Sequence, residues 1–217
     1  MRSEEIAQYL QDNPQFFEEH ADLISRLVIP HPHGGRTISI TERQMLGLRD
    51  KNKLLEGKMS ELLQFGEEND SISEKMHRLG VAMIAAASFQ SVLHTLNFHL
   101  RDDFAIPHVA LRLWGHPENS DELPEFADVS EKLQVFAETL SEPYCGSTSG
   151  FETSSWFGDA SSHLRSQALI AMRNGGGTIG MIALGSEEPQ RFYAGMGTLY
   201  LERLGEMASA ALARVLR

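Results

Sequence analysis

A single cysteine and one histidine near it are the residues of this sequence best suited to covalent chemistry. Cys145 and His163 both fall in EPYCGSTSGFETSSWFGDASSH, a stretch rich in serine and glycine. A thiol beside an imidazole is typical of thiol enzymes, because the imidazole takes up the thiol proton. A lone cysteine is also a common small apolar residue of protein cores. We expect the second role and predict no catalytic residue, so the chain is not expected to be an enzyme.

Two histidines alternate around a proline in the segment PHPHGGRTISITERQ. His31 and His33 would point to the same side of an extended segment, which is compatible with metal binding. Two imidazoles with no cysteine or carboxylate cluster nearby make an incomplete site, however. Thr41-x-x-Gln44 has the form of a capping box, which starts a helix. We therefore predict a connector here, with no metal site and no cofactor.

Two glycine motifs resemble those of enzymes without their context. GGGTIG, residues 175–180, fits the dinucleotide pattern G-x-G-x-x-G. That motif requires a strand before it and a helix after it, because the pyrophosphate binds at the helix N-terminus. Here a second β-like run follows, so the glycines are expected to form a hairpin turn. GSTSG, residues 146–150, has Thr148 where a nucleophile elbow requires serine.

An arginine on a predicted strand is the best candidate for binding a ligand. The run HVALRLWG alternates, with Val109, Leu111 and Leu113 on one face and Ala110, Arg112 and Trp114 on the other. Arg112 needs solvent, a carboxylate or a bound anion. Either it pairs with the acidic segment 118–142 or it anchors a ligand. If a pocket lies between the sheet and a loop over 141–163, we expect the following lining residues: Arg112, Trp114, Tyr144, Trp156, Phe157 and His163.

The elements that would hold these residues follow from periodicity. QALIAMR and TIGMIALGS are nearly continuous apolar runs joined by Asn174-Gly175-Gly176, which predicts a hairpin in the middle of a sheet. Residues 128–140 and the C-terminal stretch have the apolar spacing of helices. Residues 81–103 are expected to continue a preceding helix.

In the first 80 residues the regular elements predicted are all helices. Three short helices end at Pro30, and a long helix is expected over 41–80. With Leu48 at heptad position a, Asn69 also falls at a, where a polar residue fixes the register of a two-stranded coiled coil. Gly66 and Gly80 each weaken the helix, so breaks are possible there. The alternative is an amphipathic helix packed within its own chain.

Composition excludes several classes of protein. The 217 residues include 30 acidic and 19 basic ones, giving a formal net charge of −11, which disfavours direct binding to nucleic acid or to anionic membranes. One cysteine excludes an internal disulfide and fits a reducing compartment. Neither a signal peptide nor a membrane-spanning run is visible. We expect a cytoplasmic protein.

The N-terminal residues also carry a family resemblance. The stretch IAQYLQDNPQFFEEHADLISRLVIPHPHGGRTISITERQ resembles the start of the bacterial family called domain of unknown function 484, and VALRLW, SQALIAM, GMIALGS and RFYAGMGTLYLERLGE also look like that family. The resemblance implies a GAF-like fold, a class of small-molecule sensors and dimerisation modules, without an established activity. The matching positions are Tyr9, Leu10, Pro14, Phe16, Phe17, His20, Pro30, His31, Gly35, Ser39, Glu42, Arg43 and Gln44.

Together these patterns predict an α+β protein. A helical cap and connector over 1–40 and a long coiled-coil-like linker helix over 41–80 precede a GAF-like domain over 81–217, with an antiparallel central sheet and flanking helices. We expect a homodimeric sensor or regulatory module that binds an unidentified small molecule. The alternative is a scaffold for a separate protein partner, with a GAF core filled by its own aromatic residues. The third hypothesis is a thiol enzyme using Cys145 and His163.

Overall fold

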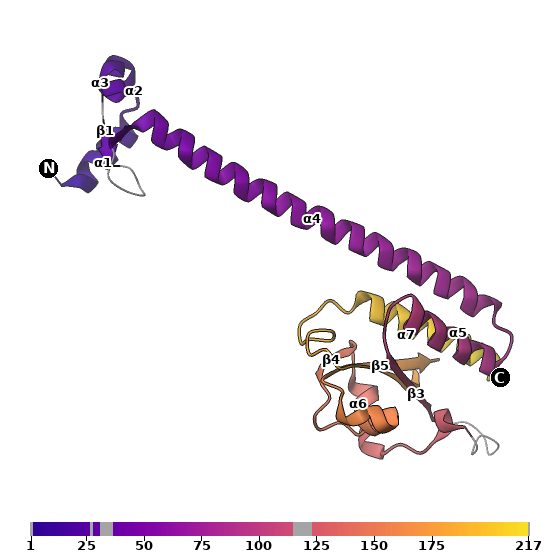
Figure 1. The fold of residues 1–217 in the computed structure, drawn as a ribbon. Helices are drawn as coiled ribbons and strands as arrows, with labels where there is room; N and C mark the ends of the chain where they lie inside the picture. The colour runs from indigo at the N-terminus through magenta and orange to yellow at the C-terminus, as the bar shows by residue number, and fades with distance from the viewer. Residues whose placement is uncertain (1, 27, 31–36, 115–122, 217) are drawn as a thin grey trace. The chain divides into compact units, whose positions relative to one another are not determined.

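The computed structural model describes residues 2–26, 28–30, 37–114 and 123–216. The chain divides into two compact units, Met1–Glu68 and Asn69–Arg217. Figure 1 shows the elements of both units in chain order. The predicted histidine connector, His31 and His33, lies outside the described residues.

The first unit begins with the three predicted short helices. They are α1 (Ser3–Asp12), α2 (Gln15–Glu19) and α3 (Ala21–Arg26). Two short strands not expected from the sequence follow, β1 (Val28–Pro30) and β2 (Thr37–Ser39), which pair antiparallel. Helices α1 and α2 have no buried residue, and large apolar side chains such as Tyr9 and Phe17 are exposed.

The long helix α4 runs unbroken from Ile40 to Ala85, through both Gly66 and Gly80. Its polar side chains pair along the helix surface: Gln64 donates to Glu68 at 2.9 Å, and Lys58 lies 2.6 Å from Glu61. Such pairs support an exposed helix. The helix starts at Ile40, so Thr41 lies inside its first turn instead of at the cap.

Four antiparallel strands form the sheet of the second unit, in the order β3-β6-β5-β4. The central hairpin is confirmed, and Gly175 and Gly176 take positive φ of 60° and 97° in its turn, a conformation that favours glycine. The predicted α+β class with an antiparallel central sheet is therefore confirmed. The strands are β3 (His108–Leu113), β4 (Tyr144–Ser147), β5 (Ser166–Asn174) and β6 (Gly177–Ser186).

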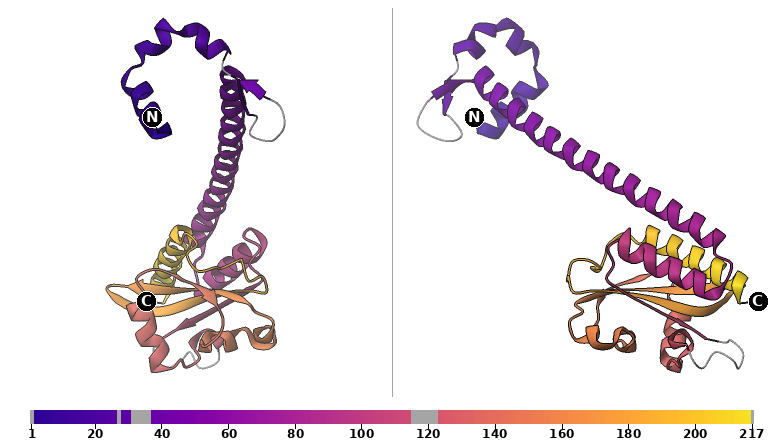
Figure 2. Two further views of the ribbon diagram at one scale, coloured as in Figure 1. Left: turned by 90° about the vertical axis from the view of Figure 1, so that its left-hand side faces the viewer. Right: turned by 45° about the vertical axis from the view of Figure 1, so that its right-hand side comes forward.

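One face of the sheet carries the main core. Helices α5 (Phe89–Asp102) and α7 (Leu199–Val215) lie on this face, and α6 (Glu131–Thr139) lies on the other (Figure 2). The buried side chains of this core include Leu96, Leu100, Leu111, Leu113, Ile170, Met172, Ile182, Leu184, Leu204, Ala208 and Leu212. Leu111 and Leu113 therefore face as their alternation predicted.

The last turns of α4 belong to the same core. Met76, Leu79 and Met83 are buried in it, and Ile72 packs against it. These positions form the most regular part of the predicted heptad pattern. The structure shows that they pack within their own chain, so they do not present a seam to a second chain.

A break separates α4 from α5, where the sequence predicted one continuous helix. Ser88 caps α5 by accepting a hydrogen bond from the Ser91 amide, 3.2 Å away. At the other side of the break, Arg214 of α7 donates to the carbonyl oxygens of Ile84 at 2.7 Å and Met83 at 3.0 Å. These carbonyls have no partner within the helix, so the arginine caps α4.

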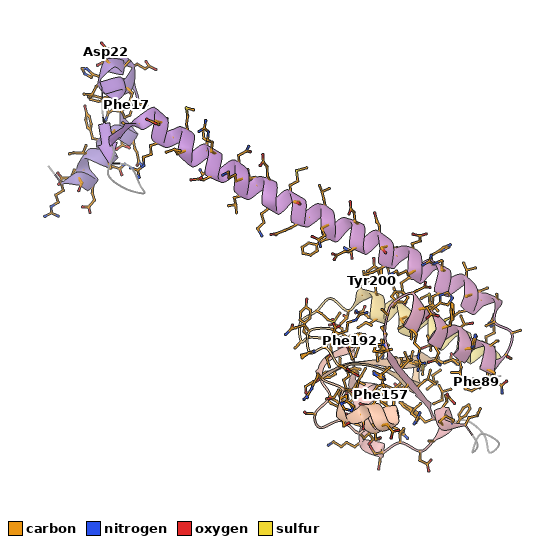
Figure 3. All side chains as sticks on the ribbon, in the orientation of Figure 1. Phe17, Asp22, Phe89, Phe157, Phe192 and Tyr200 are labelled. Carbon is orange, nitrogen blue, oxygen red and sulfur yellow. The ribbon has the colours of Figure 1, made fainter. Side chains whose placement is uncertain are left out.

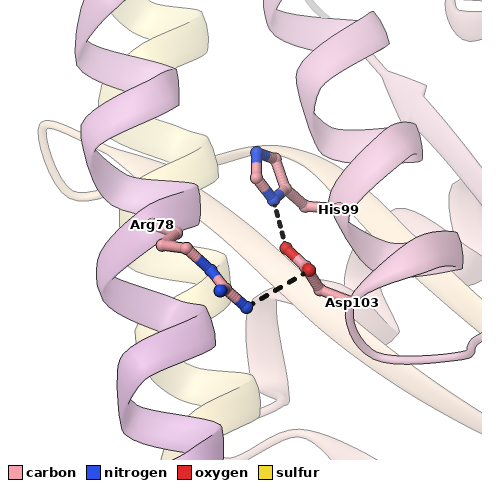
Figure 4. A network of polar contacts seen from close by, with 3 residues as sticks. All are labelled: Arg78, His99 and Asp103. Atoms are coloured by element: carbon pink, nitrogen blue, oxygen red, sulfur yellow. Dashed lines mark hydrogen bonds and ion pairs between the residues drawn. The ribbon is translucent and has the colours of Figure 1, made fainter.

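A polar network also joins α4 to α5 (Figure 4). His99 Nδ1 lies 2.5 Å from Asp103 Oδ2, and Arg78 of α4 lies 3.3 Å from Asp103 Oδ1. The hydrogen bond with His99, helped by Arg78 and opposed by desolvation, lowers the pKa of the Asp103 carboxyl. The network thus holds the ends of two helices together through one carboxylate.

Candidate functional site

The candidate site is the sheet face opposite α5 and α7. Successive residues of a strand point to opposite faces, so Leu169 of β5 and Met181 and Ala183 of β6 face this side. They are fully buried with Leu133 and Ala137 of α6, which begins at a Ser130 cap. This side is where a GAF-like pocket was predicted.

The segment 141–163, predicted as a loop, is more ordered than its composition suggested. It contains the edge strand β4 and a 3-10 helix, η2 (Glu152–Ser162), with a kink at Gly158 where φ is +56°. Thr153 Oγ1 donates to Gln167 Oε1 at 2.9 Å, and both residues are fully buried. This hydrogen bond, which no sequence motif indicated, fixes η2 to the sheet.

Four of the six predicted pocket residues come together on this face. Trp114, Tyr144, Trp156 and Phe157 all pack against the buried cluster, with Phe136 and Phe151 beside them. Each ring has its own contact within the chain. Trp114 Nε1 donates to the Thr178 carbonyl oxygen at 2.8 Å, and the Tyr144 ring centre lies 4.8 Å from that of Phe151. The rings therefore fill the region between the sheet and η2.

Arg112 lies at the edge of this aromatic cluster. Its guanidinium carbon is 5.1 Å from the centre of the Trp156 ring, and its Nη1 donates to the Leu111 carbonyl oxygen at 2.9 Å. Burial lowers the pKa of Arg112, and the charge of Glu125 opposes this shift. Glu125 belongs to the acidic segment that was one of the two predicted partners of Arg112.

A small cavity of about 150 Å³ lies beside Arg112. Its polar lining includes Asn97 and Glu125, and the Trp156 ring forms part of its wall. Pockets for drug-sized ligands are typically about 300–1,000 Å³. The space left here is therefore suited only to a very small ligand or to water.

The structure does not bring Cys145 and His163 into a catalytic pair. His163 is exposed at the end of η2, whereas Cys145 is half-buried and packs against the main core on the other sheet face. Burial raises the pKa of the Cys145 thiol to about 11. Within the described part of the chain, no hydrogen bond links the two side chains.

Other candidate chemistry is also accounted for. GGGTIG forms the hairpin turn and the start of β6, so no helix N-terminus follows it. Among the described residues, no group of three histidine, cysteine, aspartate or glutamate side chains is arranged for a metal ion. None of the helices in the described ranges combines the length and apolar character that a membrane span needs.

Comparison with known proteins places the chain in a family. The family model described as "Protein of unknown function, DUF484" matches residues 1–216. The chain belongs to the DUF484 family. The resemblance inferred from the N-terminal motifs is thereby confirmed, and DUF484 accounts for both units of the chain.

This DUF484 protein has relatives among the enterobacteria. It is 27% identical over 216 residues to "Uncharacterized protein YigA" of Salmonella typhimurium, an alignment that covers 96% of this chain and 90% of the relative. The protein of the same name from Escherichia coli is 24% identical with the same coverage.

Two solved structures are similar to parts of the DUF484 chain. One is the free methionine-R-sulfoxide reductase of Neisseria meningitidis, with 14% identity and a TM-score of 0.48, covering 66% of this chain and 89% of the reductase chain. The other is the GAF domain of a putative sensor histidine kinase from Pseudomonas syringae pv. tomato. It has 16% identity and a TM-score of 0.44, covering 70% of this chain and 91% of that domain.

Proposed function

We propose that this protein is a non-enzymatic, homodimeric interaction module. Its GAF-like unit has a core filled by its own side chains, and its helical segments make the contacts with partners. The observation that carries this proposal is the filled sheet face. Side chains of Trp114, Tyr144, Trp156 and Phe157 pack against the buried cluster on the sheet face where a ligand pocket was predicted. Of the two main hypotheses from sequence, the filled scaffold fits this packing better than the sensor.

The chemistry of the site agrees with a non-enzymatic role. A thiol whose pKa is raised to about 11 is almost wholly protonated near neutral pH, and the thiolate is the reactive form. His163 is exposed at the end of η2, and among the described residues no hydrogen bond joins it to Cys145 of β4. A nucleophile and its base must lie within hydrogen-bond reach.

The exposed apolar residues of the first unit provide the contact surface. Ile6, Tyr9 and Phe17 on α1 and α2 and Leu23 on α3 are between 39% and 52% exposed. Large apolar side chains that remain open to solvent can mark a surface that binds a protein partner. We propose that this cap, residues 1–40, binds a separate protein.

Native mass spectrometry of protein purified without added ligand tests whether the GAF-like unit holds a small molecule. The expected spectrum contains the dimer with no additional bound mass, and a metabolite panel produces no bound species. A small molecule that is retained by the wild type and lost in Arg112→Ala would contradict the scaffold hypothesis and support the sensor hypothesis.

The sensor remains a second candidate because of one observation. Arg112 and Glu125 line the same small cavity, so it offers both signs of charge to a compact ligand such as a small amino acid. The metabolite panel should therefore contain small zwitterions and small anions. Binding by zwitterions alone would indicate that Arg112 and Glu125 together recognise the ligand.

Truncation tests the cap. Deleting residues 1–40 should abolish partner binding, while the tryptophan fluorescence of the remaining chain stays native, because both tryptophans lie in the second unit. Retention of every partner by the truncated chain would contradict the proposed role of the cap.

A further inference from the structure

The first half of α4 carries a row of large apolar side chains that its own chain leaves open. Met45, Leu48, Leu55, Met59 and Leu62 are between 49% and 69% exposed. They recur at spacings of three, four and seven residues along an unbroken helix, so they lie on one side of it. Figure 3 shows the side chains of this stretch projecting from the helix.

This row fits a heptad register different from the one expected from the whole sequence. With Met45, Asn52 and Met59 at position a, the d positions are Leu48, Leu55 and Leu62. The register based on Leu48 as a placed Lys51 and Lys58 at d, where charged side chains are unfavourable. The shifted register moves both lysines to the flanking g position.

From this register we propose that residues 45–62 of α4 form a parallel, in-register, two-stranded coiled coil with a second copy of this chain. The proposal rests on the homodimer of the proposed function and names its contact surface. Asn52 is the only polar residue of the six a and d positions in this stretch. An asparagine at a single a position favours pairing with its own copy, which fixes register and two-stranded assembly.

Charge complementarity selects the parallel orientation. In a parallel pair, a residue at g lies beside the residue five positions later at e of the partner helix, which places Lys51 beside Glu56 of the second copy. In an antiparallel pair g faces g and e faces e, so repulsion between Lys51 and Lys58 of the second copy would offset the attraction between Arg49 and Glu56. The same contacts recur twice by two-fold symmetry.

The outward positions agree with this register. Position f, which faces away from the partner, is occupied by Asp50, Gly57 and Gln64. Further along the row, Met76 and Met83 are already buried in the core of their own chain. The C-terminal residues of this row therefore pack within their own chain. Its N-terminal residues, 45–62, are expected to pack against a second copy.

Site-directed cross-linking tests the proposal in the full chain. In a Cys145→Ser background, Leu48→Cys and Leu62→Cys should each form a disulfide-linked dimer under mild oxidation, at a rate more than tenfold above that of Gln64→Cys. Identical seam residues face each other in the parallel pair, and a disulfide requires Cα atoms within about 7 Å. Gln64, at position f, is the outward-facing control.

The cross-linking pattern separates the possible failures. If neither Leu48→Cys nor Leu62→Cys links to its own copy, and Leu48→Cys links to Met59→Cys in a mixture, the pair is antiparallel and the proposal is wrong. If neither links although sedimentation shows a dimer, the dimer uses another surface, and the proposed function survives while this inference does not. If sedimentation shows a monomer, both fail.

A second variant tests Asn52 independently. Asn52→Leu should lower the concentration at which the dimer dissociates at least tenfold, because the buried polar pair is replaced by an apolar one. Gln64→Leu should leave that concentration unchanged. Equal effects of the two substitutions would show that Asn52 does not lie in the seam.

Discussion

The guanidinium carbon of Arg112 lies 5.1 Å from the centre of the Trp156 ring, so the residue predicted as a ligand anchor is engaged by an aromatic side chain of its own fold. We expect Arg112→Ala to lower the free energy of unfolding by about 1 kcal/mol, the typical contribution of a partly exposed cation–π pair. Urea unfolding measures this change.

A double-mutant cycle with Trp156→Leu, which removes the aromatic ring, is the control for this prediction. Trp114 remains as the fluorescent probe, and the coupling between the two sites should be about 0.5–1 kcal/mol. A coupling of zero would show that the stacking does not contribute to stability.

Cys145 should react slowly with alkylating reagents. Burial raises the pKa of its thiol to about 11, so the thiolate fraction near neutral pH falls about a hundredfold relative to an ordinary cysteine. The rate measured by mass spectrometry should rise about tenfold per pH unit between pH 7 and 10. In concentrated urea the same thiol should react at the ordinary rate. Rapid labelling of the folded chain at pH 7 would revive the thiol-enzyme hypothesis.

Asp103 should make the stability of the second unit depend on acid pH. Its carboxyl pKa is lowered in the folded chain, so the ionised form stabilises the fold above the ordinary pKa of aspartate. This contribution disappears as the pH falls through the lowered value. Asp103→Asn should cost about 1 kcal/mol at pH 7, as for a partly exposed ion pair, and nothing at strongly acid pH.

Asp102→Asn is the matched control, because it removes a neighbouring exposed carboxylate from the same helix. Equal pH profiles for the two variants would contradict a special role of the network of Arg78, His99 and Asp103.

Gly180 and Gly57 should respond oppositely to alanine. A Cβ at Gly180 of β6 would collide with the Arg112 carbonyl oxygen and lie 2.7 Å from the side chains of Leu113 and Met172. Gly180→Ala is expected to cost about 1–3 kcal/mol through overpacking. A Cβ at Gly57 meets no atom within 4 Å, so Gly57→Ala should stabilise α4 by about 1 kcal/mol.

Tryptophan fluorescence and circular dichroism separate these two effects. Trp114 and Trp156 both lie in the second unit, so fluorescence should respond to Gly180→Ala alone. The helical circular dichroism signal should increase in Gly57→Ala. A stabilising Gly180→Ala would show that the sheet can relax around the added methyl group.

The regular elements were predictable because their residues alternate or recur with a clear period. Leu111 and Leu113 took the predicted face of β3, and Asn174-Gly175-Gly176 supplied the turn of the central hairpin. The break after Ala85 was not predicted, since AMIAAAS reads as a continuous helix and only the Ser88 cap marks its interruption.

The filled site was harder to predict than the fold. Trp156 and Phe157 lie in an irregular 3-10 segment with no period to indicate a face, so their packing depends on tertiary contacts such as the bond between Thr153 and Gln167. The sequence did not show that Trp114, Tyr144, Trp156 and Phe157 pack against one buried cluster. The exposed heptad row of α4 was not predicted, because the sequence does not show that Met76, Leu79 and Met83 belong to the core of their own chain.

Sedimentation equilibrium of the intact chain at micromolar concentration shows directly whether two copies associate. We expect a mass twice that of the 24.2 kDa chain, and a return to the single-chain mass when Leu55→Glu places a charge in the row of exposed apolar residues on α4. Gln64→Glu, on the outward side of the same helix, should remain dimeric. A wild-type chain that sediments at the single-chain mass would rule out the homodimer.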